Sequence, residues 1–171
     1  MTTLLLARHG ETDWNAERRW QGHADVPLNE RGREQARALA EEIASDGRVD
    51  AIYASDLSRA RDTAEIVGAR LGLPVVVDPD LREIDVGSRE GLTGDLDGPW
   101  DGEPQEAHAE RILRAVHGIA ARHSGERVLV VTHGGSLRRI REHLGVEGTG
   151  PFENCATWVC AWEDGALRAI D

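Results

Sequence analysis

Two histidines in this 171-residue sequence each stand beside a glycine, directly after a short apolar run. Leu4 to Leu6 leads into residues 8–10, Arg-His-Gly, and Val128 to Val131 leads into residues 132–135, Thr-His-Gly-Gly. In open α/β sheets ligands bind beyond the carboxyl ends of the strands, so both segments stand where a site would form. Either histidine alone is as easily an ordinary loop residue. The two together favour an anion site at this edge of the sheet, with His9 and His133 beside it.

The residues around these histidines indicate that the anion is a phosphate. Arg8 carries a planar guanidinium that binds phosphate oxygens in pairs, through charge-assisted hydrogen bonds worth about 1.5 to 3 kcal/mol each. Gly134 allows backbone amides to approach an anion closely, and a helix beginning near Ser136 would add its N-terminal amides and dipole. The sequence therefore predicts a phosphate site built from two strand ends.

The apolar pattern predicts the elements that position these residues. Short apolar runs typical of strands buried on both faces lie at 4–6, 51–54, 75–77 and 128–131. Helical periodicity between them predicts helices over 36–43, 60–71, 109–120 and 137–144. Residues 156–162 and 166–170 predict a terminal hairpin. We expect one domain over residues 1–171, an α/β fold in which a three-layer α/β/α sandwich encloses a mostly parallel, mixed sheet.

Further blocks of the sequence resemble one family. Residues 8–12, Arg-His-Gly-Glu-Thr, resemble the signature of the histidine phosphatase superfamily, which includes the cofactor-dependent phosphoglycerate mutases. Other blocks follow in that family's order, at Asn15 and at residues 19–28, 55–60, 81–83 and 132–135. Together they cover most of residues 3–93 and 127–141. The resemblance implies a phosphoglycerate mutase-like fold and phosphoryl transfer through a phosphohistidine.

The resemblance also implies a role for each catalytic residue. His9 would attack phosphorus, His133 would flank the transferring phosphoryl group, and Arg8 and Arg59 would clamp its oxygens. Glu83 would protonate the leaving oxygen and then activate water, a task for which burial near other acids would raise its pKa. Asn15 would add a hydrogen bond, Gly134 would contact the phosphate, and Gln21 and Gly22 would line the substrate entrance.

Some neighbouring residues compete for these roles. Arg61 and Arg59 are two helical positions apart, about 200° around the axis, so they cannot face one pocket, and we choose Arg59. A solvated acidic turn is the alternative for Glu83, since Asp85 would share its face in an extended segment. We interpret Glu11 as a structural residue or as one that supports the site residues without contacting the phosphate.

Composition and charge argue against nucleic-acid and membrane partners. The formal net charge of −11 argues against a nucleic-acid surface, and no apolar run approaches the ~20 residues of a membrane helix. The N-terminus lacks a basic leader, which favours a cytoplasmic protein without a signal peptide. Cys155 and Cys160 fall in one predicted strand with side chains on opposite faces, so we expect no disulfide between them.

The remaining histidines and the tryptophans do not indicate a metal or cofactor site. His108, His117, His123 and His143 lack a recognised metal-ligand spacing, so we expect surface or helix-face residues, no metal and no cofactor. Trp158 and Trp162 are expected in the core. Trp14, Trp20 and Trp100 are candidates for the mouth of the site.

The segment Gly91 to Pro104 favours hydrolysis over mutase-type transfer. It is rich in Gly, Asp and Pro, contains no Lys or Arg, and is predicted to be a short exposed loop where the family usually carries further helices. A phosphoglycerate carboxylate would lack a partner there. We therefore expect a metal-independent phosphatase acting on a small phosphorylated metabolite. Mutase-type transfer and a non-catalytic phosphate-binding module are the alternatives, and the oligomeric state is not indicated.

Overall fold

The computed structural model describes residues 1–94, 98–148 and 150–170, and these residues build a six-stranded sheet in the order β3-β2-β4-β1-β5-β6. Strands β3, β2, β4 and β1 are parallel to one another, whereas β5 and β6 form an antiparallel hairpin beside β1. The predicted mixed, mostly parallel sheet is confirmed. The strands are β1 (Thr2–Arg8), β2 (Ala51–Ala54), β3 (Val75–Val77), β4 (Arg127–Thr132), β5 (Thr157–Glu163) and β6 (Ala166–Ala169).

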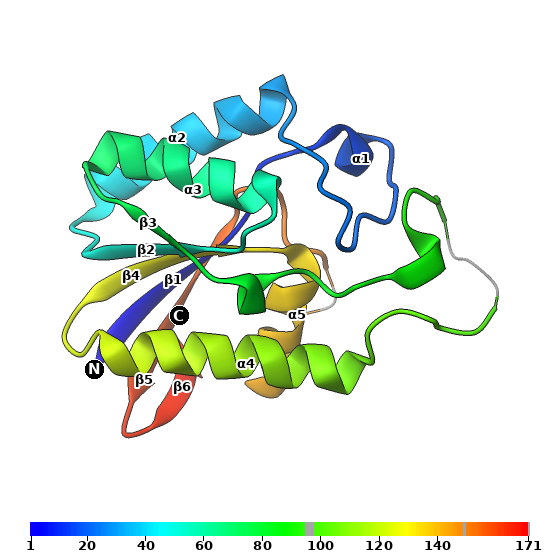
Figure 1. Cartoon of the computed structure of the whole chain (residues 1–171). Helices are drawn as coiled ribbons and strands as arrows, with labels where there is room; N and C mark the ends of the chain where they lie inside the picture. Colours follow the sequence, from blue (N-terminus) through cyan, green and yellow to red (C-terminus); the bar gives the residue numbers. More distant parts are fainter. Residues whose placement is uncertain (95–97, 149, 171) are drawn as a thin grey trace.

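Helices cover both faces of this sheet. Figure 1 shows α2 (Glu30–Asp46) and α3 (Ser58–Leu71) on one side, and α4 (Gln105–Arg122) and α5 (Gly134–His143) on the other. The predicted α/β/α layering is therefore present. Three short elements lie in the connections: α1 (Asp13–Ala16), η1 (Pro79–Leu81) and η2 (Gly87–Arg89). No helix among the described residues is long and apolar enough to cross a membrane.

The central strand β1 shows why the sheet needs both helical layers. Successive side chains of a strand point to opposite faces. Leu4 and Leu6 therefore pack with α4 and α5, whereas Leu5 and Ala7 pack with α2 and α3. Each leucine buried in this way contributes about 2 kcal/mol. The double-sided packing fixes the end of β1, from which Arg8 and His9 emerge.

The outer strands differ from prediction in two respects. Val76 and Val77 of β3 are 47% and 43% exposed, because β3 is an edge strand with only β2 beside it. The expectation of burial on both faces is wrong for this strand. Cys155 does not lie in the same strand as Cys160, since β5 begins at Thr157. Both cysteines are free, as predicted.

Two predictions about large side chains had different outcomes. Trp158 and Trp162 pack against the core on the α4 and α5 side, as expected. His108 lies on a face of α4, one of the two predicted alternatives, but it is fully buried, so the surface alternative is wrong. Its position explains the burial, because His108 lies one helical turn before Ile112 and so shares the core-facing stripe of α4.

Candidate active site

A cavity of about 610 Å³ lies where the chain leaves β1 and β4. This volume is in the range of roughly 300 to 1,000 Å³ typical of small-molecule sites. All of the predicted site residues except His133 line it: Arg8, His9, Asn15, Gln21, Gly22, Arg59, Glu83 and Gly134. His133 is completely buried beside His9, with the two ring centroids 5.2 Å apart. The structure thus brings together residues that are spread over most of the sequence.

The imidazole of His9 has a defined orientation. Its Nδ1–H donates to the carbonyl oxygen of Gly10 at 2.6 Å, which puts the lone pair on Nε2. Burial, together with the positive charges of Arg59 and Arg8, holds the pKa of His9 well below its usual value. A neutral imidazole with a free ring nitrogen is a competent nucleophile. His9 can therefore attack an electrophile without first losing a proton.

His133 presents both ring nitrogens to the interior. It is the N-cap residue of α5, and neither nitrogen has a hydrogen-bond partner among the described residues. Burial first, and then Arg59, His9 and Arg8, hold its pKa well below the usual value. A buried N–H without an acceptor is costly unless a ligand supplies one. His133 is thus available to donate to an oxygen of a bound anion.

Arg59 is held in place before any ligand arrives. Its Nη1 and Nη2 donate to the carbonyl oxygens of Ala24 and Gly22, both at 2.8 Å, and the side chain is 1% exposed. Burial lowers its pKa to about 10, so the group stays charged at neutral pH. Its Nε has no partner among the described residues. Arg61 instead pairs with Asp62 and Glu65, which agrees with the choice of Arg59.

Arg8 is anchored in the same manner. Its Nη1 donates to the carbonyl oxygen of Phe152 at 2.6 Å, while its Nε is buried with no partner in the described part of the chain. Burial lowers the pKa of Arg8, and the nearby Glu83 acts in the opposite direction. Two fixed guanidinium groups with unused donors make a site for a dianion.

Glu83 is held by two backbone amides. Gly135 N–H donates to Oε2 and Ile84 N–H donates to Oε1, both at 2.9 Å. The surroundings differ from the sequence expectation of neighbouring acids. Arg8 and Arg59 are close charged partners of Glu83, and the Asp85 carboxylate accepts from Gly87 N–H instead.

Asn15 and Gln21 are oriented by the residues around α1. Asn15 Oδ1 accepts hydrogen bonds from Thr12 N–H and from Asn154 Nδ2, so its own amide donor is available to the cavity. Gln21 Oε1 accepts from the Thr12 hydroxyl at 2.8 Å. Glu11 accepts from Asn29 at the start of α2, a contact that suits its interpretation as structural.

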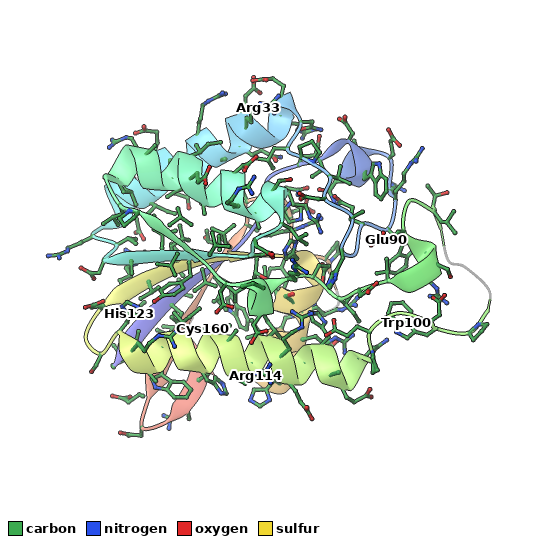
Figure 2. The ribbon with its side chains drawn as sticks, in the orientation of Figure 1. Arg33, Glu90, Trp100, Arg114, His123 and Cys160 are labelled. Carbon is green, nitrogen blue, oxygen red and sulfur yellow. The ribbon has the colours of Figure 1, made fainter. Side chains whose placement is uncertain are left out.

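Gly22 and Glu90 shape the wall next to Arg59. Gly22 has φ +51°, and a Cβ there would lie 2.6 Å from the Val86 side chain, so only glycine fits. Glu90, labelled in Figure 2, accepts from the N–H groups of His23 and Ala24 at 2.9 Å. These bonds fix the loop whose carbonyl oxygens hold Arg59.

The tryptophans predicted at the mouth divide into two groups. Trp14 and Trp20 line the cavity, and Trp20 Nε1–H donates to the Gly94 carbonyl oxygen at 2.9 Å. The backbone of Trp20 also pairs with Gly91 and Leu92, so the start of the segment 91–104 rests against this wall. Trp100 is not among the cavity-lining residues and donates to the Glu103 carbonyl oxygen. Residues 95–97 of this segment lie outside the described residues.

Several lining residues were missed by the sequence analysis. Arg18, Arg138 and Phe152 line the cavity, and Asn154 Nδ2 donates to the His9 carbonyl oxygen at 3.1 Å. Arg18 has φ +57°, the left-handed turn common just past a helix end, here the end of α1. The capping pattern of Thr12 and Asn15 could have revealed α1. Nothing local to residues 150–154 signals their approach to His9.

Comparison with known proteins identifies the family. The family model described as the histidine phosphatase superfamily, branch 1, matches residues 4–167. The chain belongs to that superfamily. The predicted family is thereby confirmed, and with it the fold.

Individual relatives of this histidine phosphatase are similar over most of its length. It is 42% identical over 160 residues to the metal-independent phosphoserine phosphatase of Arabidopsis thaliana, covering 82% of this chain and 67% of the relative. It is 40% identical over 159 residues to phosphoglycerate mutase-like protein 4 of the same plant, covering 81% and 69%. The solved structure of Bacillus stearothermophilus YhfR superimposes with a TM-score of 0.89 at 35% identity, covering 99% and 95% of the two chains.

These relatives bear on the predicted enzyme class. The expectation of a phosphoric monoester hydrolase of the histidine phosphatase type is confirmed at the level of the family. In the described part of the chain, no cluster of three or more His, Cys, Asp or Glu side chains could hold a metal ion. The residues fit a phosphoryl group: two arginines, a free imidazole nitrogen, an unpartnered histidine and a carboxylate surround one cavity.

Proposed function

We propose that this histidine phosphatase hydrolyses small phosphomonoesters, without a metal ion, through a phosphohistidine on His9. The observation that carries the proposal is the bond from His9 Nδ1–H to the Gly10 carbonyl oxygen, which leaves Nε2 as the free ring nitrogen. Around it lie the unused donors of Arg8, Arg59 and His133. The name of the metal-independent phosphoserine phosphatase agrees with this chemistry.

In the first step, Nε2 of His9 attacks phosphorus and the bond from phosphorus to the ester oxygen breaks. Arg8 and Arg59 neutralise the charge on the non-bridging oxygens, and His133 donates to one of them. Such preorganised donors stabilise a transition state because they need no rearrangement when charge develops. Glu83 delivers a proton to the departing oxygen, so that an alcohol leaves rather than an alkoxide.

In the second step, water attacks the phosphohistidine. Glu83, now a carboxylate, accepts a proton from the water as its oxygen bonds to phosphorus. The bond between phosphorus and Nε2 then breaks, which releases inorganic phosphate and restores neutral His9. Asn15 contributes a donor to the phosphate oxygens through its amide nitrogen. Because the displacement is divided into two steps, the same residues serve the formation and the hydrolysis of the phosphohistidine.

Hydrolysis is favoured over transfer to a second substrate by the segment 91–104. It contains no Lys or Arg, so it offers no cation to hold a phosphorylated acceptor. The described part of it pairs with Trp20 and does not add a helix over the cavity. We therefore infer that water, rather than a second substrate, accepts the phosphoryl group.

The cavity nevertheless has cations that suit a second negative group on the substrate. Arg18 and Arg138 line it from the end of α1 and from α5. Arg18 forms no ion pair with any described residue, and Arg138 lies 3.9 Å from Glu142. The sequence inference that a carboxylate would lack a partner considered only the segment 91–104. We therefore include phosphorylated carboxylic acids, such as phosphoserine, in the substrate class.

A single assay tests the proposed reaction. Purified protein with a chelator is incubated with a panel of phosphomonoesters, and separately with 3-phosphoglycerate plus 2,3-bisphosphoglycerate, beside the His9→Ala and His143→Ala variants. His143 is an exposed histidine on α5 and serves as the matched control. We expect phosphate release that needs His9 but not His143, and acid-labile phosphate trapped on His9.

Other outcomes would favour other functions. Isomerisation of 3-phosphoglycerate without phosphate release would favour mutase-type transfer. Binding without turnover would favour a phosphate-binding module. Hydrolysis by His9→Ala as fast as by the parent would contradict the mechanism.

A further inference from the structure

His108 is a buried titratable residue that the mechanism above does not use. It lies on α4 and is completely buried, and its Nε2 is 3.0 Å from the hydroxyl oxygen of Ser136 on α5. Ser136 is also completely buried. Two polar side chains from different helices thus meet in the interior, where a hydrogen bond must satisfy both.

The direction of this bond follows from the other polar atoms. The Ser136 hydroxyl lies 3.2 Å from the carbonyl oxygen of Arg82 and can donate its single proton there. His108 Nδ1 has no partner among the described residues, so protonating it would bury an unsatisfied donor. The proton of a neutral His108 therefore sits on Nε2 and is donated to Ser136. Burial also lowers the pKa of His108, which keeps the ring neutral.

This chain of bonds ends at Glu83 by two short routes. Ser136 holds the carbonyl of Arg82, the residue directly before Glu83. Ser136 also stands directly after Gly135 in the first turn of α5, and Gly135 N–H donates to Glu83 Oε2 at 2.9 Å. Whatever fixes Ser136 therefore fixes both the backbone and the carboxylate of Glu83.

We propose that His108 is a positioning residue for Glu83, acting through Ser136 and the first turn of α5. The proposal rests on the acid role proposed for Glu83 above. It requires no contact between His108 and the substrate, and His108 does not line the cavity.

A second residue of α4 binds the same segment and supports this view of the helix. Arg111, one turn after His108, donates to the carbonyl oxygens of Asp80, Arg82 and Glu83 at 2.9 to 3.2 Å. It is itself held by Glu103 through two bonds of 2.9 and 2.7 Å. Arg111 fixes the backbone only, whereas His108 also reaches the carboxylate through α5. The two residues therefore make separable contributions.

The experiment compares two esters that differ in their need for an acid. The departing oxygen of phosphoserine must be protonated as it leaves, whereas p-nitrophenyl phosphate can release a stable phenolate without a proton. The readout is kcat/KM, which covers the steps up to departure of the leaving group. General-acid catalysis contributes roughly 10²- to 10⁴-fold, so mispositioning Glu83 should cost about tenfold for phosphoserine and less than about twofold for p-nitrophenyl phosphate.

The variants separate the hydrogen bond from the volume of the side chain. His108→Leu fills the space without a donor and is expected to show the selective loss. His108→Gln keeps a donor at a similar reach and is expected to restore most of it. His117→Leu, on the same helix beside Trp162, is the control and should leave the ratio of the two esters unchanged.

A double-mutant cycle with Ser136→Ala tests the route. If His108 acts through Ser136, kcat/KM for phosphoserine should fall no further in the double variant than in the more impaired single variant. Where His108→Leu fails to fold, Ser136→Ala removes the same bond from the other partner and should give the same selective loss.

The proposal is overturned if His108→Leu lowers kcat/KM equally for both esters, or lowers it for neither. It is also overturned if a folded His108→Gln is as impaired as His108→Leu. A parent chain that hydrolyses neither ester would instead overturn the proposed function. The two failures are therefore distinguishable.

Discussion

Glu83 and Gly135 fit each other so closely that any side chain at position 135 would displace the Glu83 carboxylate. The amide of Gly135 donates to Glu83 Oε2 at 2.9 Å, and a Cβ on residue 135 would lie 2.3 Å from Oε1. The glycine thus provides both a donor and the space for the carboxylate.

Gly135→Ala is expected to lower kcat/KM for alkyl phosphates by about 10- to 100-fold, a part of the general-acid contribution. The obstructed atom is the end of a flexible side chain, so Glu83 can swing away and the stability should change little. Activity and thermal unfolding are measured on one preparation. Gly118→Ala is the control, because its new Cβ would meet only Arg122 Nη1 at 3.5 Å. Unchanged turnover by Gly135→Ala would argue against Glu83 as the acid.

Arg59→Lys is expected to reduce both activity and stability. A lysine keeps the charge but cannot hold the carbonyl oxygens of Gly22 and Ala24 while donating to a phosphate. Leaving buried acceptors unsatisfied costs about 1 to 3 kcal/mol of unfolding free energy, measured by urea denaturation. We expect kcat/KM to fall by about 10²-fold. Arg61→Lys should change neither quantity, and a similar loss there would refute the assignment of the clamp to Arg59.

Arg18→Ala is expected to act only on substrates with a second negative group. The pair 3-phosphoglycerate and glycerol 3-phosphate differs by one carboxylate, so comparing their KM values isolates that group. Loss of a charge-assisted bond of about 1.5 kcal/mol predicts a roughly tenfold rise in KM for 3-phosphoglycerate and no rise for glycerol 3-phosphate. Arg37→Ala, an exposed arginine paired with Glu30 on α2, is the control. A rise of equal size for both substrates would contradict the prediction.

The buried histidines predict that acid destabilises the fold. His9, His108 and His133 have pKa values lowered by burial, so the folded protein stays unprotonated where the unfolded chain takes up protons. Their stabilising effect is complete above the unfolded value of about 6.5, and it is lost as the pH falls from there through the folded pKa.

The size of this effect can be measured by urea unfolding between pH 7.5 and 5.5. Each such histidine contributes up to about 1.4 kcal/mol per pH unit within the window. His133→Asn should flatten the dependence, whereas His143→Asn at the exposed end of α5 should not. A parent stability that rises as the pH falls would show that these histidines become charged in the folded state.

The sequence was most informative where chemistry follows directly from neighbouring residues. Strands β2 and β3 have the predicted bounds, and the histidines stand at the ends of β1 and β4, because apolar runs and glycines are local signals. Helical geometry indicated that Arg59 and Arg61 cannot share one pocket, and the family resemblance favoured Arg59. In the structure Arg59 lines the cavity, whereas Arg61 pairs with Asp62.

What the sequence could not predict depends on contacts between distant segments. His108 meets Ser136 because α4 packs on α5, and the two residues are 28 positions apart. Arg18 and Arg138 line one cavity although they are remote in the sequence and belong to different elements, so no local pattern connects them. The exposure of β3 follows from its place at the sheet edge, and an apolar run of three residues looks alike at the edge and in the centre.

The bonds between residues 8–9 and residues 152–156 have a consequence for the synthesis of the enzyme. The backbone of Arg8 and His9 pairs with Cys155, Arg8 Nη1 reaches Phe152, and Asn154 holds the His9 carbonyl oxygen. On a ribosome, the segment with the nucleophile emerges more than 140 residues before the segment that fixes it. Contacts between such remote segments form slowly. A nascent chain released before residue 150 would therefore carry the complete signature around His9 and still be catalytically silent.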